Sequence, residues 1–597
     1  MRACVRAVLL ACLLAAPAAA RAQVTVSLSQ NYAQLMTGQT LQFSATVSGS
    51  ANRGVTWQVN NANAGTTASG KITKMGLYTA PVIAPYPAVA TITAVSKADP
   101  SVSATATVTI LTQVQGGNTY YVAPGGSDAG AGSIGDPWKT IQHAADRAAA
   151  GDTVYVRQGV YNEHVTFKKS GSAGRFITFA GYPGETATLD GTGLDIPENM
   201  WGLFTFQDAS YVIAEGFELR NYTTSSTQDV PIGIFVFGAG SNVQLINNNV
   251  HDITTTAQTT PLKCNSNAFG ITVYGTKAPD AIDGLAVSGN EVWHLKTGCS
   301  ETLSLDGNVT NWAVVSNRVH DDDNIAIGAI GFERVSKDPA YDQARDGVIR
   351  GNTVYNITSY GNPDYGKQYA ADGVYVDGGT NIVIEQNLIH HVDLGIELAS
   401  EHKDHVSSFV TARNNLVYDG NSAGISIGGY ASGRGGTDHC TIVGNTLYNN
   451  DTQNTGSGEF QIQFHATSNI FENNIVYAGA QGLMVNDFTT SSPDPALLDY
   501  NLYFSSVGAN NAVFNWQKHK YKGYEAYRTA TGLDADSPAF SDPQFVSLGD
   551  PPNLDIAASS PVRNAGVVLG SAVAGMFDFP GYKRVVVGQT NIGAYQH

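Results

Sequence analysis

Short segments in which apolar and polar residues alternate recur through the middle of the chain. Examples are GITVYG, TLSLDG, GVYVDG, GIELAS and GISIGG, which begin at Gly270, Thr302, Gly373, Gly395 and Gly424. Because side chains on a strand point alternately to its two faces, each segment is predicted to be a strand with a buried aliphatic face. The pairs predicted to point inward are Ile271/Val273, Leu303/Leu305, Val374/Val376, Ile396/Leu398, Ile425/Ile427 and Leu483/Val485. The residues between them are left on an outer face.

A second pattern precedes most of these strands: Asn, any residue, an aliphatic residue, then an aromatic residue or His. It begins at Asn248, Asn290, Asn317, Asn352, Asn387, Asn415, Asn445 and Asn474, at intervals of 27 to 42 residues. The period is too irregular for helical repeats and its flanks are typical of strands, which predicts stacked β-coils about 4.8 Å apart. Asn side chains stacked at one bend can hydrogen-bond along the column. We therefore predict that these asparagines are structural.

Residues 23–112 have a different character. VTWQV (55–59), ATITAVSKAD (90–99) and their neighbours alternate apolar and polar residues between short Gly, Asn and Pro turns, which is typical of a β-sandwich. Trp57 is the predicted core aromatic. The segment resembles the bacterial immunoglobulin-like modules that precede catalytic domains in secreted enzymes, where the expected role is a spacer or a weak glycan binder. Residues 113–119 are predicted to be a linker.

The chain changes again at Tyr120. The segments YYVAPGGSD (120–128), GDPWKTIQHAAD (135–146) and AGDTVYVRQGVYNE (150–163) predict strands and a helix over about 138–149 that covers an open strand edge. Together they resemble the first module of right-handed parallel β-helix proteins of the pectate-lyase-like superfamily, including family 9 pectate lyases and family 6 alginate and chondroitin lyases. The expected fold is all-β: an immunoglobulin-like β-sandwich, then a right-handed parallel β-helix (solenoid) over 120–499, then C-terminal coils and a cap over 500–597.

The N-terminus predicts export. Residues 1–22 combine Arg2 and Arg6, an apolar run and the small-residue signal Ala20-Arg21-Ala22, which is typical of a secretory signal peptide cut before Gln23. A lipoprotein signal ending at Cys12 is the alternative. No later stretch has the roughly 20 apolar residues of a membrane span. We expect a secreted monomer.

The charge balance narrows the choice of partner. Net charge is −17 with 14% charged residues, so nucleic acid, which binds clustered Lys and Arg, is not expected. An acidic polysaccharide would need a local basic patch or a bridging divalent cation. Three cysteines follow the signal peptide, and Cys264 and Cys299 precede successive strands, so either they pair or all three, with Cys440, are free thiols.

Outward positions on the alternating strands collect polar and acidic side chains on the middle coils. Tyr375 and Glu397 are predicted lateral neighbours, with Asp377 offset by one position, about 5–8 Å from Glu397. Asp306 is expected about two coils away. The predicted catalytic residues are Lys403, Glu397, Asp377, His402 and Tyr375; the predicted substrate-binding residues are Arg434, Tyr274, Gln461, Gln463 and His465.

The preferred function is a lyase that acts on a uronic-acid polysaccharide. Such a lyase removes the C5 proton and expels the O4 substituent, so it needs a base and a cation near the uronate. Lys403 is the first candidate base, with His402 and Tyr375 as alternatives. The predicted Ca²⁺ ligands are hard oxygen donors: Asp306, Asp322, Asp323 and Asp372, with Asp377 as a further one.

The resemblance covers these motifs only in part. Family 9 lyases carry an Asp-Asp-Gly-Phe-Asp-like calcium turn, where this chain has DDNIA (322–326) and ADGVY (371–375), and GIELASEHK (395–403) resembles the Glu-plus-Lys arrangement of family 6. Three alternatives therefore stay open. A glycoside hydrolase could pair Asp377 with Glu397 or Asp306; a non-catalytic β-helix could bind glycan through Tyr274, Tyr375, Gln461 and Gln463; and an epimerase shares the proton abstraction.

Overall fold

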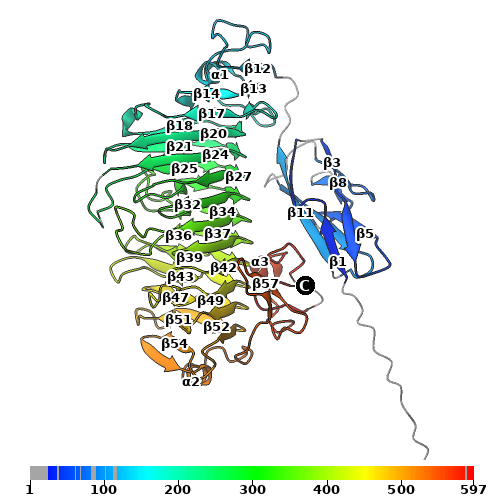
Figure 1. Cartoon of the computed structure of the whole chain (residues 1–597), viewed down its shortest axis with the longest axis vertical. Helices are drawn as coiled ribbons and strands as arrows, with labels where there is room; N and C mark the ends of the chain where they lie inside the picture. Colours follow the sequence, from blue (N-terminus) through cyan, green and yellow to red (C-terminus); the bar gives the residue numbers. More distant parts are fainter. Residues whose placement is uncertain are drawn as a thin grey trace, which may run out of the picture.

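The computed structural model describes most of the chain as two β-rich units (Figure 1). The described residues are 24–36, 39–60, 62–66, 69–81, 89–100, 102–111, 117–257, 259–261, 263–584 and 588–596. The predicted signal peptide and the first residues of the predicted linker lie outside these ranges. No helix within them is long and apolar enough to cross a membrane.

The first unit, for which an immunoglobulin-like β-sandwich was predicted, is built of short β-sheets. Among the described residues it has sheets in the orders β2-β11-β10-β5-β6 and β3-β9-β8-β7, and a β1-β4 pair. Trp57, on β5, is 6% exposed and lies in the core of this unit, as predicted. The strands are β1 Thr25–Leu28, β2 Tyr32–Met36, β3 Thr40–Gln42, β4 Ala45–Ser48, β5 Val55–Val59, β6 Ala62–Asn63, β7 Gly65–Thr66, β8 Gly70–Ile72, β9 Leu77–Thr79, β10 Val89–Ser96 and β11 Ser103–Leu111.

The second unit is the right-handed parallel β-helix, whose coils are stacked along the long axis in Figure 1. Each full coil contributes strands to three sheets, which we call sheets 1, 2 and 3. The described part of sheet 1 consists of β12 Thr119–Val122, β13 Thr153–Val156, β16 Ile177–Gly181, β19 Val212–Glu215, β22 Gly240–Ser241, β23 Gln244–Ile246, β26 Ile282–Asp283, β27 Ala286–Ser288, β30 Val309–Thr310, β31 Ala313–Val315, β34 Arg345–Arg350, β37 Thr380–Glu385, β40 Val406–Ser408, β41 Thr411–Arg413, β44 Gly436–Asp438, β45 Thr441–Val443, β48 Ala466–Thr467, β49 Asn469–Glu472 and β52 Ala496–Asp499.

Sheet 2 contains the Asn motifs and sheet 3 contains the alternating segments. The strands of sheet 2 are β14 Gly159–Tyr161, β17 Ala187–Asp190, β20 Phe217–Thr224, β24 Asn249–Thr255, β28 Glu291–Trp293, β32 Arg318–Asp322, β35 Thr353–Ile357, β38 Leu388–Val392, β42 Leu416–Tyr418, β46 Thr446–Tyr448, β50 Ile475–Ala478 and β53 Leu502–Ser505. Those of sheet 3 are β15 Val165–Phe167, β18 Met200–Gln207, β21 Val230–Phe237, β25 Phe269–Gly275, β29 Leu303–Gly307, β33 Ile327–Ile330, β36 Asp372–Asp377, β39 Leu394–Ala399, β43 Ile425–Ile427, β47 Phe460–Ile462, β51 Leu483–Asp487, β54 Val513–Trp516 and β55 His519–Lys522.

The predicted alternation on sheet 3 is confirmed except at one position. Val374, Val376, Ile396 and Leu398 are fully buried in one continuous core that runs the length of the β-helix. At Leu483 the register with β54 shifts, and Met484 joins the core in its place. A local irregularity of this kind turns one side chain away from the face that strict alternation would give it.

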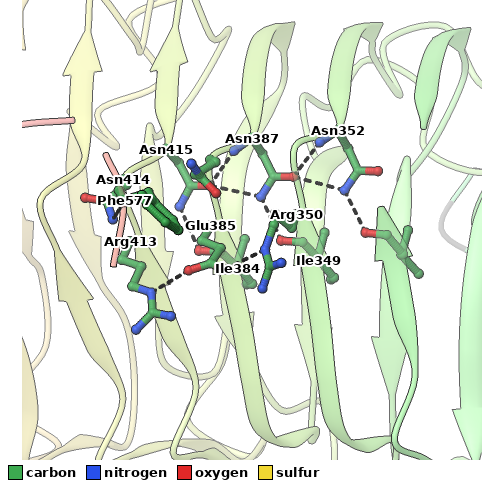
Figure 2. A network of polar contacts seen from close by, with 12 residues as sticks. Ile349, Arg350, Asn352, Ile384, Glu385, Asn387, Arg413, Asn414, Asn415 and Phe577 are labelled. Carbon is green, nitrogen blue, oxygen red and sulfur yellow. Dashed lines mark hydrogen bonds and ion pairs between the residues drawn. The ribbon is translucent and has the colours of Figure 1, made fainter. Parts of the chain in front are cut away.

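The asparagines form the predicted ladder at the bend before sheet 2 (Figure 2). Asn387 is fully buried; its backbone N–H and its Nδ2 both donate to Asn415 Oδ1, at 3.0 and 2.9 Å, and Nδ2 also donates to Ile349 O at 3.0 Å. In the same way, the backbone N–H and the Nδ2 of Asn352 both donate to Asn387 Oδ1. The ladder continues to Asn501, one coil beyond the predicted repeat. Each rung satisfies backbone groups that a tight bend would otherwise bury unpaired.

The last residue of each Asn motif forms a second column on the outside of sheet 2. Neighbouring rings in the middle of the column are stacked almost parallel, for example His320 on Tyr355 at 4.7 Å and His390 on Tyr418 at 4.9 Å, whereas Tyr448 and Tyr477 meet edge-on. Stacking along the column covers the ring faces. These rings therefore pack against one another and do not offer the open faces on which a sugar would stack.

Both ends of the β-helix are covered. The N-terminal helix α1 spans Ile141–Arg147, shorter than predicted, and begins where Thr140 Oγ1 accepts a hydrogen bond from His143 N at 3.2 Å. At the other end, helix α2 (Tyr524–Thr531) buries Tyr524 and Tyr527 against β54. The strands β56 (Phe545–Ser547) and β57 (Asn553–Ile556) and helix α3 (Ser571–Ala574) follow.

The C-terminal segment also runs back along the coils instead of only capping them, and Figure 1 shows it beside the sandwich. Asn414 Nδ2 donates to Ala574 O at 2.9 Å, and Thr105 Oγ1 of the sandwich donates to Gly581 O at 3.0 Å. The sandwich also contacts sheet 1 directly, where Tyr32 OH and Ser288 Oγ are 3.2 Å apart. The first unit is thus docked on a different sheet from the acidic residues described below.

Cys264 and Cys299 form a disulfide, and Cys440 is a buried free thiol. The bond closes a loop between residues 35 apart in the sequence. We expect the double variant Cys264→Ser/Cys299→Ser to lose about 3 kcal/mol of stability, because the unfolded chain regains the entropy of that loop. Thermal unfolding with and without reductant checks this: reductant should lower the melting temperature of the natural protein but leave the variant unchanged.

Candidate active site

Seven carboxylic acids gather where the middle strands of sheet 3 meet the loops that follow them. We call this group the acidic cluster; its members are Glu301, Asp306, Glu333, Asp372, Asp377, Glu397 and Glu401. The stacking of coils produces it, since β29, β33, β36 and β39 are successive strands. Residues remote in sequence therefore become neighbours on one face, as predicted for Asp306, Asp377 and Glu397.

Tyr375 and Glu397 lie side by side on adjacent coils, in register and both outward from the core, as predicted. Burial raises the pKa of Glu397 to about 7, although hydrogen bonds from Ser426 and Gln463 favour the carboxylate. Gln463 Nε2 donates to Glu397 Oε1 at 2.5 Å and so fixes its orientation. Tyr375 is 6% exposed, and its hydroxyl donates to Glu401 Oε1 at 3.3 Å. The pair places a carboxyl that titrates near neutrality beside a protonated phenol.

Asp372 flanks this pair on the same strand as Tyr375. It is 2% exposed, and its Oδ1 has no hydrogen-bond partner among the described residues. Burial raises the pKa of Asp372 well above its usual range, and the negative charge of Glu397 raises it further. Two carboxyls in such surroundings tend to share one proton.

Asp377 connects the cluster to the loop after β39. Its Oδ1 accepts a hydrogen bond from Glu401 N at 2.7 Å, and its Oδ2 lies 3.9 Å from His402 Nε2. The same imidazole nitrogen is 3.0 Å from Glu333 Oε1. One ligand atom from each of Glu333, Asp377 and His402 lies within 4.8 Å of the other two.

Asp306 lies on sheet 3 two strands away from Asp377. It is 4% exposed, and its Oδ1 has no hydrogen-bond partner in the described part of the chain. Burial raises the pKa of Asp306 well above normal, with further contributions from Glu301 and Glu333. Its charge also acts on Asp377. A buried carboxylate oxygen without a donor is costly unless it holds a proton or a cation.

Lys403, the first predicted base, is placed differently. Its side chain is exposed in the turn after β39 and forms no hydrogen bond or ion pair with the described residues. The neighbouring His402 and Glu401 turn toward the cluster instead. The geometry of this turn directs Glu401 and His402, but not Lys403, toward the cluster.

The predicted substrate-binding residues surround the cluster. Arg434 Nη1 donates to Glu401 O at 3.1 Å, and its guanidinium lies 4.9 Å from the centre of the Tyr430 ring. Tyr274 is in register with Asp306, and Gln461 is in register with Ser426, which is in turn beside Glu397. His465 lies further out, with Nε2 2.9 Å from Ser432 O.

The predicted calcium set does not come together, which corrects the sequence analysis. Asp322 accepts hydrogen bonds from Leu295 N at 2.7 Å and Thr302 Oγ1 at 3.1 Å, and Asp323 accepts one from Thr297 N at 2.7 Å. Thr302 is four residues from Asp306 along an extended chain, about 13 Å. Asp322 and Asp323 therefore satisfy donors of the neighbouring coil and lie apart from Asp306.

Three members of the cluster were not among the predicted site residues: Glu301, Glu333 and Glu401. Each lies just before or just after a sheet 3 strand, outside the alternating segment. Burial raises the pKa of Glu301 to about 7. Acidic residues that flank successive sheet 3 strands on either side are a signal that could have identified them.

A separate polar hollow of about 490 Å³ opens near the ends of sheet 2 strands. Its lining residues are Asn356, Thr358, His391, Asp419, Asn421, Thr452 and Gln453. None of the predicted site residues is among them. The hollow and the acidic cluster are distinct features.

Comparison with known proteins supports the fold. A family model described as the Pel9A-like right-handed β-helix region matches residues 120–290. The uncharacterized protein YwoF of Bacillus subtilis (strain 168) is 36% identical over 430 residues, which cover 72% of this chain and 89% of that protein. Pectate lyase PEL9 of Emericella nidulans is 29% identical over 216 residues, 34% of this chain and 50% of that protein.

Among solved structures, that of pectate lyase Pel9A covers 81% of this chain and 98% of its own, with 15% identity and a TM-score of 0.44. The segment matched by the family model ends at residue 290, before the first member of the acidic cluster. The family model therefore covers the first coils of the scaffold, whereas the match to YwoF extends over 72% of the chain. With 36% identity to a relative of which nearly nine-tenths is covered, and with the matching family model, this chain belongs to the Pel9A-like right-handed β-helix family.

Proposed function

We propose that this protein cleaves a uronic-acid polysaccharide by β-elimination at the acidic cluster, with Glu397 as general base and Tyr375 as general acid. The observation that carries the proposal is the in-register pair of Tyr375 and Glu397 on adjacent coils. The named relative PEL9 is a pectate lyase, which supports the reaction class. The match to the Pel9A-like β-helix model and to PEL9 supports an enzyme that acts on polysaccharide.

Glu397 has the properties of a base for C5. A general base works best when its pKa is near the operating pH, and burial raises the pKa of Glu397 to about 7. Gln463 and Ser426 hold its carboxylate in place. The proton leaves C5 for a Glu397 oxygen as the C4–C5 double bond forms.

Tyr375 is the donor to the departing O4. A phenol stays protonated at neutral pH, and burial together with the nearby Asp377 raises the pKa of Tyr375 further. Its hydroxyl already donates to Glu401, so the proton is oriented within the cluster. As the C4–O4 bond breaks, the Tyr375 proton passes to the leaving oxygen, which prevents an unstable alkoxide.

The uronate carboxylate needs a positive partner among so many acids. Arg434 lies at the edge of the cluster, held by Glu401 O and by the Tyr430 ring, and a guanidinium can bind a carboxylate through two hydrogen bonds. We assign it that role. No step is assigned to calcium, because the predicted ligand set does not gather.

Hydrolysis is the second candidate, and one observation favours it. Asp372 and Glu397 are neighbouring carboxyls with raised pKa values, and a protonated carboxyl beside an ionised one is the acid–base arrangement of glycoside hydrolases. In that reaction Asp372 would protonate the glycosidic oxygen. The substrate of such a hydrolase would not need to contain uronic acid.

The products separate the two reactions. We expect incubation with pectate, alginate and glycosaminoglycans to yield new reducing ends from at least one of them. Elimination leaves an unsaturated uronate, so each new end should be matched by an equivalent rise in ultraviolet absorbance. New reducing ends without that absorbance would mean hydrolysis; neither signal on a broad panel of polysaccharides would leave a binding protein.

Secretion is part of the proposal. It is supported by the signal-peptide pattern of residues 1–22, which lie outside the described residues. Mass spectrometry of the N-terminus of protein recovered from the medium tests it, with Gln23 as the expected first residue.

A further inference from the structure

We propose that Glu333, Asp377 and His402 form a binding site for a divalent transition metal of the Zn²⁺ or Mn²⁺ class, at the edge of the acidic cluster and near the buried Asp306. The site differs from the predicted calcium set in having an imidazole ligand and in lacking Asp322, Asp323 and Asp372. It goes beyond the proposed reaction and does not depend on it.

The first argument is the convergence of donors from three separate parts of the chain. Glu333 follows β33, Asp377 ends β36 and His402 follows β39, yet one ligand atom of each lies within 4.8 Å of the other two. His402 Nε2 lies between the two carboxylates, 3.0 Å from Glu333 Oε1 and 3.9 Å from Asp377 Oδ2. An ion with bonds of about 2.1 Å to each ligand fits a triangle of this size after small side-chain movements.

The second argument is the orphan oxygen of Asp306. This side chain is 4% exposed, its Oδ1 has no hydrogen-bond donor among the described residues, and its negative charge raises the pKa of Asp377. Nothing in the described fold supplies the positive charge that this carboxylate lacks. A cation held by Glu333, Asp377 and His402 would bring positive charge near it.

The surroundings also orient the ligands. Glu401 N donates to Asp377 Oδ1 at 2.7 Å, which leaves Oδ2 directed at His402. Phe332, next to Glu333, is edge-on to the His402 ring with centroids 6.4 Å apart and restricts its rotation. Outer contacts that fix ligand orientation are typical of built metal sites.

The donor set indicates the class of metal. Calcium takes six to eight oxygen ligands, whereas an imidazole nitrogen favours zinc and related ions, and carboxylates are shared with manganese. One nitrogen and two carboxylates, one of them on the exposed Glu333, leave open positions for water or substrate. A sugar hydroxyl or carboxylate could bind there.

Calorimetric titration of the EDTA-treated, full-length secreted protein with Zn²⁺, Mn²⁺ and Ca²⁺, without substrate, tests the proposal. We expect one equivalent of Zn²⁺ or Mn²⁺ to bind, and Ca²⁺ to bind at least tenfold more weakly. His402→Gln, Asp377→Asn and Glu333→Gln should each weaken binding at least 30-fold. Glu333 is exposed, so its variant should fold even where the buried Asp377 variant does not.

Glu397→Gln is the matched control, because it removes one carboxylate from the same acidic cluster but none of the proposed ligands. It should alter the affinity less than about fivefold. If Glu397→Gln weakened metal binding as much as the ligand variants do, the metal would be held by general electrostatic attraction and not by the proposed ligands. Absence of stoichiometric binding, or a Ca²⁺ preference that His402→Gln leaves intact, would overturn the proposal. Neither result would decide whether the protein cleaves polysaccharide, which the analysis of reaction products tests separately.

Discussion

Replacing Glu397 with Gln is expected to lower kcat/KM for the best polysaccharide substrate by at least about 100-fold, since a positioned general base contributes about 10²–10⁴-fold. The substitution keeps the shape of the side chain and can still bond Ser426 and Gln463, so the fold should survive. Steady-state rates on the substrate identified from the product assay provide the measurement. Glu525→Gln, the same change at an exposed residue of helix α2, is the control and should leave the rate unchanged.

The same residue sets the expected pH dependence. A base acts only when deprotonated, and the pKa of Glu397 is raised to about 7, so activity should be lost as pH falls through about 7. An acid limb near 4.5, the ordinary value, would show that Glu397 is not the titrating base. Lys403→Ala tests the competing base from the sequence analysis. If Lys403→Ala loses turnover and Glu397→Gln does not, the Lys403 amine is the base that removes the C5 proton.

Replacing Asn387 with Ala is expected to lower the free energy of unfolding of the β-helix by about 4 kcal/mol. The change removes the acceptor of Asn352 N and Nδ2 and the donor to Ile349 O (Figure 2), and a buried polar group left without a partner costs about 1–3 kcal/mol. Urea unfolding followed by far-ultraviolet circular dichroism measures the loss. The site is fully buried, so water cannot replace the amide without opening the coil.

Asn511→Ala is the matched control, because Asn511 is exposed and donates one hydrogen bond to Val507 O at 3.0 Å. Its effect should stay within about 0.5 kcal/mol, as for most surface substitutions. Similar losses for the two variants would indicate that the ladder does not carry coil-to-coil stability.

The periodic part of the protein could be predicted from sequence because its causes are local. Alternation of Val374, Tyr375 and Val376 follows from strand geometry alone, and a recurring Asn at each bend marks where one coil passes to the next. Stacking then fixes lateral neighbours, which is why Tyr375 and Glu397 were predicted as a pair and lie in register. The C-terminal segment has no such period, and a cap was predicted there from the resemblance to β-helix proteins, whose last coil must have its strand edges covered.

The chemistry of the site depends on contacts that no local pattern contains. Whether an acid is solvated, bonded to a neighbouring coil like Asp322, or left without a donor like Asp306 depends on loops of unequal length folding over sheet 3. The turn after β39 points His402 inward and Lys403 outward, although both belong to the same short motif. Sequence alone thus determined the solenoid, its buried face and the column on which acids gather, because strand geometry repeats every two residues. Only the tertiary structure decided which acids are buried together and how their protons are held, because burial and electrostatic energy are summed over groups brought together from distant parts of the chain.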